Sequence, residues 1–430
     1  MKLAINGGKK LREKPFPAYN TIGKEEEEAV LRVLRSGKLS TYLGTWHDDF
    51  YGGSEVRDLE KEWAEFFGVK HAISVNSATS GLYATIGAIG INPGDEVIVT
   101  PYTMSASASA ILLYGGIPVF ADIEEDYFCL DPKSVEKLIT SKTKAIMAVD
   151  IFGGVADFDK LRAIAKKYNL KIIEDAAQAP LAKLGSDFAG TLGDVGVFSL
   201  NYHKHIHCGE GGIVVTNDEN IAFKIQLIRN HAESVLHAKG YKNKSELNNM
   251  LGFNYRMTEI EAAIARVQLK KLERLVRERR ENVVYLEEKL KNLPFLEIPK
   301  LRHNSTHSYY VHVLLYKEDI VNIHRNRFID AVKAELPKTL LRDDSDTLLG
   351  YGYVKPIYLE PLYQERVCFG EYPFNLTNRI YNKGDCPVCE DMHNNKLITH
   401  EFMRPGMSKK NLDDVVKAFE KVWENRERIN

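Results

Sequence analysis

The chain has 430 residues, of which 44% are hydrophobic and 27% are charged, a balance that excludes disordered and fibrous proteins and indicates a sizeable buried core. This length predicts two or three structural units. Lys and Arg number 58 against 59 Asp and Glu, so no net charge draws the protein to nucleic acid or to an anionic membrane, and a small molecule is the expected partner.

The N-terminal segment lacks the continuous apolar stretch of a signal peptide, and no later segment approaches the ~18 apolar residues of a membrane span. We therefore expect a cytoplasmic protein with no membrane association. The 5 cysteines are too few for a disulfide framework in a chain of this length, and their odd number leaves at least one unpaired. Reduced thiols are the expectation.

Between about residue 70 and residue 220, short β-branched runs alternate with helical stretches. The predicted strands begin at His71, Glu96, Pro118, Lys144, Lys171, Asp194 and Gly211. This alternation predicts an α/β fold with a mostly parallel seven-stranded sheet between helices. Ligands of such sheets bind at the carboxyl ends of the strands, so the segments that follow the strands are the first candidates for a site.

A long helix is predicted over residues 258–291, where apolar residues recur at spacings of three and four. The arginines between Arg274 and Arg280 have helical charge spacing and are best explained as a solvated face. We expect this helix to link a large domain, residues 1–257 with an N-terminal arm, to a smaller C-terminal α+β domain, residues 292–430. That second domain contains the aromatic strand HSYYVHVLLY and a final amphipathic helix.

Three of the segments after strands carry residues that a pyridoxal phosphate site requires. The aldehyde of this cofactor needs a lysine for a Schiff base, its pyridine nitrogen needs a carboxylate, and its phosphate needs hydroxyls and backbone donors. Asp175 ends one predicted strand, and Ser199 and Lys204 follow another. The segment NSATSG, residues 76–81, connects a strand to a helix and so provides a helix N-terminus for a phosphate. A single Asp or Lys would be a surface charge, but the convergence of all three indicates a site.

These residues belong to motifs that resemble the DegT/StrS-type sugar aminotransferases, a branch of the fold-type I pyridoxal-phosphate enzymes. The resemblance covers nearly the whole chain. It rests on the order and spacing of NSATSG, TPYT, EDAAQA, FSLNYHK followed by GEGG, and GFNYRMTEIEAA, none of which is specific alone. It implies a fold-type I aminotransferase with pyridoxal 5'-phosphate as its cofactor.

The resemblance also implies a role for each matching residue around the cofactor ring. Lys204 would form the Schiff base and Asp175 would pair with the pyridinium nitrogen, so both are the expected catalytic residues. After the amino donor displaces it, Lys204 would become the free amine that moves the proton at the substrate Cα. Tyr102 would stack on the ring, and Gln178 would meet its phenolic oxygen.

The remaining matches concern the phosphate. Ala78, Thr79 and Ser199 would bind it within one chain. Asn254, from the GFNYRM motif, would reach the phosphate of the neighbouring subunit's cofactor, which implies a homodimer with shared active sites.

Two clusters fall outside this scheme. His203, His205 and His207 flank Lys204, where the family usually has small residues, Pro or Thr. They could alter the protonation of Lys204 or contact an anionic substrate, but packing or solvent exposure is the favoured interpretation. Cys386 and Cys389, with histidines at 393 and 400, have zinc-type donors at a non-standard spacing, and a metal-free cluster is favoured.

Alternative functions remain open at this point. Sugar dehydratases of the same family have histidine in place of the Schiff-base lysine, so Lys204 argues against that activity. A cofactor-binding regulator without turnover is weaker, because the lysine, aspartate and stacking residue are all present. The family majority aminates nucleotide-linked keto-sugars with L-glutamate, whereas the opening NGGKKLREKPFP is closer to the branch that aminates cyclitol ketones or makes aminohydroxybenzoate, often with L-glutamine. The stretches 41–57 and 340–383 depart from the common length and are expected to form the acceptor pocket.

Overall fold

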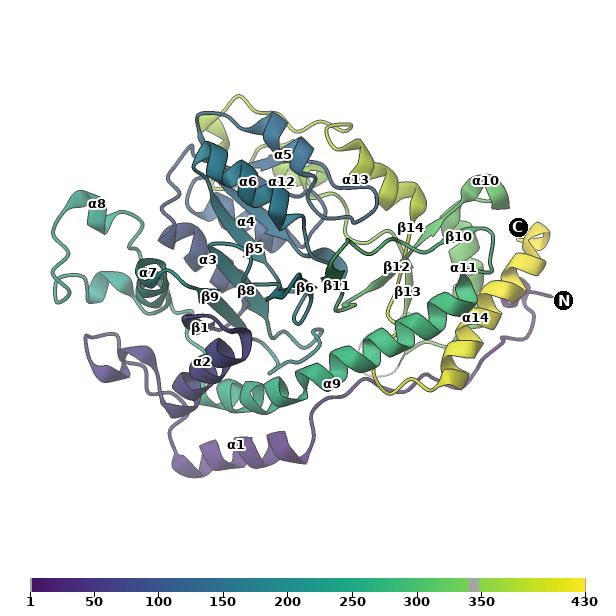
Figure 1. Ribbon diagram of the computed structural model, residues 1–430, viewed down its shortest axis with the longest axis horizontal. Helices are drawn as coiled ribbons and strands as arrows, with labels where there is room; N and C mark the ends of the chain where they lie inside the picture. The colour runs from purple at the N-terminus through teal and green to yellow at the C-terminus, as the bar shows by residue number, and fades with distance from the viewer. Residues whose placement is uncertain (1, 340–347, 430) are drawn as a thin grey trace.

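A computed structural model gives the fold over residues 2–339 and 348–429. Its main sheet has seven strands in the order β1-β9-β8-β5-β4-β2-β3 (Figure 1). The strands are β1 His71–Val75, β2 Glu96–Val99, β3 Ile117–Phe120, β4 Thr143–Val149, β5 Lys171–Asp175, β8 Val195–Ser199 and β9 Gly212–Thr216. Strand β9 is antiparallel to both of its neighbours, and the other pairs are parallel. The predicted α/β fold with a mostly parallel seven-stranded sheet is confirmed.

Helices cover both faces of this sheet, which explains why its strands are apolar on both sides. They are α2 Ser54–Phe67, α3 Ala78–Ala88, α4 Ser105–Leu113, α5 Pro132–Leu138, α6 Phe158–Tyr168 and α7 Glu219–Arg229, whereas α1 Lys24–Ser36 packs on the long helix α9 (Glu259–Leu290). On one face, Gly81 of α3 lies so close to β8 and β9 that a Cβ atom there would come within 2.9 Å of Val214. On the other face, the ring of Phe198 packs against Trp63 of α2, with ring centroids 5.4 Å apart.

A second, four-stranded antiparallel sheet follows in the order β10-β12-β14-β13. Its strands are β10 Leu296–Glu297, β12 His312–Tyr316, β13 Leu349–Tyr351 and β14 Leu397–His400. Helices α11 Arg325–Glu335 and α14 Lys409–Glu424 pack beside it and share its own apolar core. The short elements are α8 Lys244–Leu247, α10 Glu318–Val321, α12 Pro361–Gln364, α13 Pro387–Asp391 and a small sheet of β6 Lys183–Leu184, β7 Asp187–Phe188 and β11 Ser305–Thr306.

The long helix α9, Glu259–Leu290, runs past both sheets (Figure 1). It begins at a capping box in which Thr258 Oγ accepts from the Glu261 N–H and the Glu261 carboxylate accepts from the Thr258 N–H. Its first half contributes Leu269 to the core beneath β8 and β9, and its last turn contributes Leu290 to the core of the second sheet. The division into domains at residues 257 and 291 stays a prediction.

The N-terminal arm packs against the second sheet's helices, although the sequence groups it with the large domain. Leu3 and Phe16 belong to the apolar core of α11 and α14. The N–H groups of Ala4 and Leu11 donate to the buried carboxylate of Glu335 on α11. Both chain ends therefore lie at the same end of the molecule (Figure 1).

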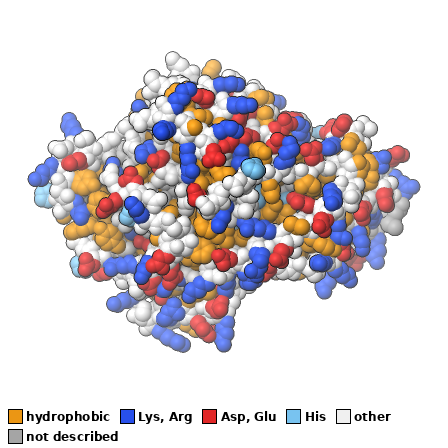
Figure 2. Space-filling view, in the orientation of Figure 1, with side chains coloured by type: hydrophobic (Ala, Val, Ile, Leu, Met, Phe, Trp, Pro, Cys, Tyr) orange, Lys and Arg blue, Asp and Glu red, His pale blue; other side chains and the backbone are white. Residues whose placement is uncertain are grey.

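The surface carries both signs of charge in close mixture. Figure 2 shows basic and acidic side chains interspersed over one face, in keeping with the formal net charge of -1. Among the described residues, no helix is both long and apolar enough to cross a membrane.

Candidate active site

A cavity of about 410 Å³ lies at the carboxyl ends of the main-sheet strands. It lies between these strand ends and the segment that leads into β12. Six of the eight predicted cofactor residues line it, namely Ala78, Thr79, Asp175, Gln178, Ser199 and Lys204. They come from three segments, after β1, β5 and β8, that the fold brings to one edge of the sheet.

Asp175 is the last residue of β5, and its carboxylate is 6% exposed. Ser107 of α4 donates its hydroxyl to Oδ2 at 2.8 Å, and the Ala177 N–H donates to Oδ1 at 3.2 Å. Burial raises the pKa of Asp175, while these two hydrogen bonds and the positive charge of Lys204 oppose the rise. These interactions do not fully offset the cost of burying the carboxylate, so Asp175 is suited to bind a cationic group of a ligand.

Lys204 lies in the loop between β8 and β9, which Asn201 organises. The Asn201 carbonyl accepts from the Lys204 N–H at 2.9 Å, and its side-chain oxygen accepts from the His203 N–H at 3.1 Å. The Lys204 side chain extends into the cavity, where its Nζ atom lies 4.2 Å from the centroid of the Tyr310 ring. The amine and the Asp175 carboxylate therefore line one cavity.

The third part of the cavity is the N-terminus of α3. Ser77 caps this helix by accepting the Ser80 N–H at 3.1 Å. The N–H groups of Ala78 and Thr79 come first in the helix, so they have no intrahelical acceptor and can bind an anion. Gly212 of β9 allows the close approach, because a Cβ atom there would lie 2.6 Å from the Ala78 nitrogen.

Gln178 follows β5 and is fixed at both ends of its amide. Its Oε1 accepts from the Phe152 N–H at 2.8 Å, and its Nε2 donates to the Tyr353 hydroxyl at 3.1 Å. The second bond joins the main sheet to the segment after β13. Both Gln178 and Tyr353 line the cavity.

Tyr102 does not fit its predicted role as the ring-stacking residue. Its side chain is 0% exposed and does not line the cavity, and its ring contacts those of Phe152, Tyr353 and His393. A ring that stacked on a ligand in this cavity would expose one face to it. The loop after β2 instead presents Met104, which lines the cavity and is 59% exposed. Met104, two residues further along the chain, is therefore the apolar side chain of this loop that is open to a ligand.

Asn254 lies outside the cavity of its own chain, on an exposed segment. Arg256 Nε donates to its Oδ1 at 2.8 Å, which leaves the amide NH₂ group as the donor for another partner. This geometry suits a residue that serves a neighbouring subunit, and the role itself stays a prediction.

The three histidines around Lys204 have separate environments. His203 lines the cavity. His205 is fully buried and bonds the Ser308 carbonyl oxygen at 2.9 Å, and burial lowers its pKa well below the ordinary value. His207 also has a lowered pKa because of burial. For His205, packing is the structural role.

The thiols of Cys386 and Cys389 are both buried, and burial raises their pKa values. Over residues 2–339 and 348–429, no group of three or more His, Cys, Asp or Glu is arranged to bind a metal ion. The part of the predicted acceptor stretch at 340–347 lies outside the described residues.

Sequence reasoning missed four contributors to the site: Ser107, Met104, Tyr310 and Tyr353. Ser107 and Met104 could have been suspected, since both follow a strand of the main sheet. Tyr310 and Tyr353 come from the far part of the chain, and no motif marked them.

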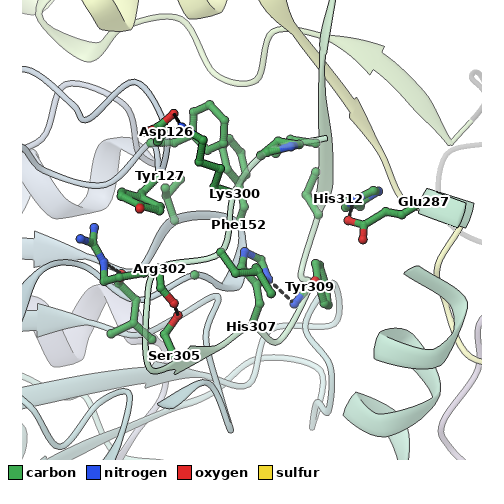
Figure 3. A pocket seen from close by; sticks show the side chains of 18 residues that line it. Asp126, Tyr127, Phe152, Glu287, Lys300, Arg302, Ser305, His307, Tyr309 and His312 are labelled. Atoms are coloured by element: carbon green, nitrogen blue, oxygen red, sulfur yellow. Dashed lines mark hydrogen bonds and ion pairs between the residues drawn. The ribbon is translucent and has the colours of Figure 1, made fainter. Parts of the chain in front are cut away.

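A second cavity, of about 40 Å³, lies behind Phe152 (Figure 3). Figure 3 shows the rings of Phe152, His307 and Tyr309 along it, with the Lys300–Asp126 ion pair at 3.1 Å. This volume suffices for a few water molecules and not for a cofactor. The larger of these two cavities is the candidate site because the predicted cofactor residues line it.

The larger cavity fits pyridoxal phosphate by the chemistry of its donors. Lys204 supplies an amine, and Asp175 supplies a buried carboxylate that can bind a cationic group. The N-terminus of α3, together with the hydroxyls of Thr79 and Ser199, supplies a site for an anion. The same amine, carboxylate and helix end are what the cofactor's aldehyde, ring nitrogen and phosphate require.

Comparison with known proteins supports the same interpretation. The sequence profile of the DegT/DnrJ/EryC1/StrS aminotransferase family matches residues 20–420. The spore coat polysaccharide biosynthesis protein SpsC of Bacillus subtilis is 32% identical over 92% of this chain and 94% of its own. The L-glutamine:2-deoxy-scyllo-inosose aminotransferase of Streptomyces lividus is 30% identical over 98% of this chain and 97% of its own. The structure of an aminotransferase from Psychrobacter cryohalolentis superposes with a TM-score of 0.81 and 28% identity, over 96% of this chain and all of the other.

Proposed function

The chain belongs to the DegT/DnrJ/EryC1/StrS aminotransferase family, and we propose that it moves an amino group from L-glutamate or L-glutamine to a nucleotide-linked keto-sugar. It is a pyridoxal-phosphate-dependent transaminase of the fold-type I class. The observation that carries the proposal is the convergence of Lys204, Asp175 and the N-terminus of α3 on one cavity.

Asp175 and Lys204 divide the chemistry. When bound, pyridoxal phosphate supplies a ring that accepts electrons as a bond to the substrate carbon breaks. The carboxylate of Asp175 keeps a proton on the ring nitrogen, and the hydroxyl of Ser107 orients that carboxylate and opposes the rise in its pKa. Lys204 anchors the cofactor and, as a free amine, takes the proton from the donor's α-carbon and returns one to the acceptor carbon.

Other residues of this chain bind and orient. Thr79 and Ser199 contribute hydroxyls, and Ala78 and Thr79 contribute N–H groups, to the phosphate. Gln178, fixed by Phe152 and Tyr353, directs its amide to the phenolic oxygen of the ring. Met104 supplies the apolar contact to the ring that the sequence had assigned to Tyr102.

Two similarities point to different acceptors. The match to a polysaccharide biosynthesis protein favours a keto-sugar, whereas the match to an inosose aminotransferase, over nearly the whole chain, favours a cyclitol ketone with L-glutamine as donor. A keto-sugar is the primary candidate because the sugar aminotransferases are the family majority, and a cyclitol ketone is the second. An aminohydroxybenzoate-forming activity is a third.

The proposed assembly is a homodimer with shared sites. Among the described residues that line the cavity there is no arginine, and the lysine is needed for chemistry. Asn254 and Arg256 lie outside it on an exposed segment, from which they can reach a partner's cavity. A site completed by the partner would give the free amide NH₂ group of Asn254 an acceptor.

The test is reduction of the holoenzyme with borohydride followed by peptide mapping. We expect the cofactor to be fixed on the peptide that contains Lys204, and the Lys204→Ala variant to bind cofactor without a reducible link. Lys183→Ala is the matched control, since Lys183 also lies over an aromatic ring but does not line the cavity. An adduct on another lysine would contradict the assignment.

The acceptor is then identified by half-reactions. A panel of amino donors should convert the bound cofactor to its amine form, and candidate keto-sugars and cyclitol ketones should convert it back. Turnover separates the enzyme from a cofactor-binding regulator, which would give no second half-reaction.

A further inference from the structure

We propose that Tyr310 is a positioning residue that holds the Lys204 ammonium inside the cavity through the face of its ring. The Nζ atom lies 4.2 Å from the ring centroid, well within the range of a cation–π contact. Tyr310 lines the same cavity and is 9% exposed, and Lys204 is half-buried. The inference rests on the proposed function, in which Lys204 carries the cofactor.

Lys204 depends on this ring because it has no closer charge partner. Over the described residues, no carboxylate forms an ion pair with its amine. The Asp175 carboxylate acts on it only at longer range and is occupied by Ser107 and Ala177. A lysine side chain is long and flexible, and among the described residues the ring of Tyr310 is the close electrostatic partner that favours this position.

The backbone of Tyr310 is fixed on two sides. Its N–H donates to the Phe152 carbonyl at 2.8 Å, and its own carbonyl accepts from Arg279 of α9 at 3.4 Å. Arg279 is fully buried, so the solvated face expected for the arginines of this helix does not include it. Phe152, seen in Figure 3, also donates its N–H to Gln178. One backbone segment therefore sets the positions of Gln178 and Tyr310 together.

Gly153 makes this approach possible. Its φ is +102°, which favours glycine, and a Cβ atom would lie 2.7 Å from the Tyr309 nitrogen and 3.0 Å from that of Tyr310. The segment before β12 can thus lie directly against the end of β4. This close contact between Gly153 and the backbone of Tyr310 places the ring beside Lys204.

The consequence for the reaction concerns the proton that Lys204 carries. A ring face stabilises the ammonium and not the neutral amine. After Lys204 takes a proton from the donor's α-carbon, the ring retains that ammonium in the cavity until the proton is delivered. Loss of the ring should lower kcat and leave the KM for the amino donor nearly unchanged, because the ring acts on the lysine and not on the donor.

The test uses the apoenzyme, with mono-, di- and trifluorinated phenylalanine incorporated at position 310. Fluorine withdraws electron density from the ring face while its shape is nearly kept, so the fold is preserved. Acylation of Lys204 at ~pH 8, followed by mass spectrometry, reports how readily its amine reacts. Tyr310→Phe should label within about twofold of the native protein, and labelling should rise with each fluorine, about tenfold in all. Lys183 in the same samples should not change.

The proposal is overturned if the labelling of Lys204 is the same across the fluorinated variants (a flat series). It is also overturned if a Tyr310→Leu variant, shown to be folded by circular dichroism, is labelled as slowly as Tyr310→Phe. The borohydride experiment keeps the two proposals separate. A flat series with the cofactor linked to Lys204 overturns the role of Tyr310 alone, whereas a rising series with the link on another lysine overturns the role of Lys204 in the proposed function.

Discussion

Ser107 donates its hydroxyl to Asp175 Oδ2 at 2.8 Å, across the gap between α4 and the end of β5. The pair is fully buried on the serine side, and the carboxylate is 6% exposed. Hydrogen bonds to an ionised group stabilise the charged form. Ser107 therefore acts on the charge that Asp175 presents to the cofactor.

Ser107→Ala should weaken cofactor binding about tenfold, because a hydrogen bond to a charged group contributes about 1.5 kcal/mol or more. Titration of apoenzyme with pyridoxal phosphate, followed by absorbance, measures this. Ser109→Ala on the same helix is the control, since Ser109 bonds the Ala106 carbonyl and not Asp175. Equal effects of both variants would show a helix defect and not a role at Asp175.

Asp175→Asn keeps the size of the side chain and removes its charge. Proton removal from the donor's α-carbon should slow by several orders of magnitude, since the ring nitrogen loses the group that keeps it protonated. Cofactor affinity should fall less. Single-turnover kinetics with L-glutamate distinguish the two effects, and near-normal turnover would refute the assignment of Asp175.

Asn254→Ala should weaken cofactor binding about ten- to a hundredfold if its amide reaches the partner's phosphate, because such bonds contribute roughly 1.5 to 3 kcal/mol. The sharper measurement mixes subunits. A dimer of one Lys204→Ala chain and one Asn254→Ala chain has one site with both lesions and one with neither, so activity should return on mixing. Failure to complement, with exchange confirmed by mass spectrometry, would mean that Asn254 acts within its own chain.

Asp150 gives a prediction for stability. It is fully buried beside Glu174, and burial first and then the Glu174 charge raise its pKa well above the ordinary 3.8. Since the folded-state pKa is the higher one, its contribution to stability is complete below about pH 4 and is lost as pH rises towards that folded value. Asp150→Asn should remove this loss, so its free energy of unfolding at neutral pH should equal or exceed the native value. Chemical denaturation across the pH range measures it, and a variant destabilised at every pH would contradict the argument.

Much of the fold could be predicted because it is encoded locally. β-branched runs at regular intervals gave all seven strands of the main sheet, and the Thr258–Glu261 capping box marks where α9 begins. The candidate site followed from the same logic, because the carboxyl ends of parallel strands meet at one edge. Lys204 and Asp175 therefore came together in the structure as expected.

The tertiary structure alone decided which side chains face the cavity. Tyr102 and Met104 lie in one short loop, and only the path of that loop buries the first and presents the second. Tyr310 meets Lys204 because β12 belongs to another sheet that docks at Phe152 and Gly153. The N-terminal arm likewise joins the core of α11 and α14, at the opposite end of the sequence. Such contacts depend on how sheets and helices pack, and no local sequence pattern at either residue of a contact predicts which residue it will meet.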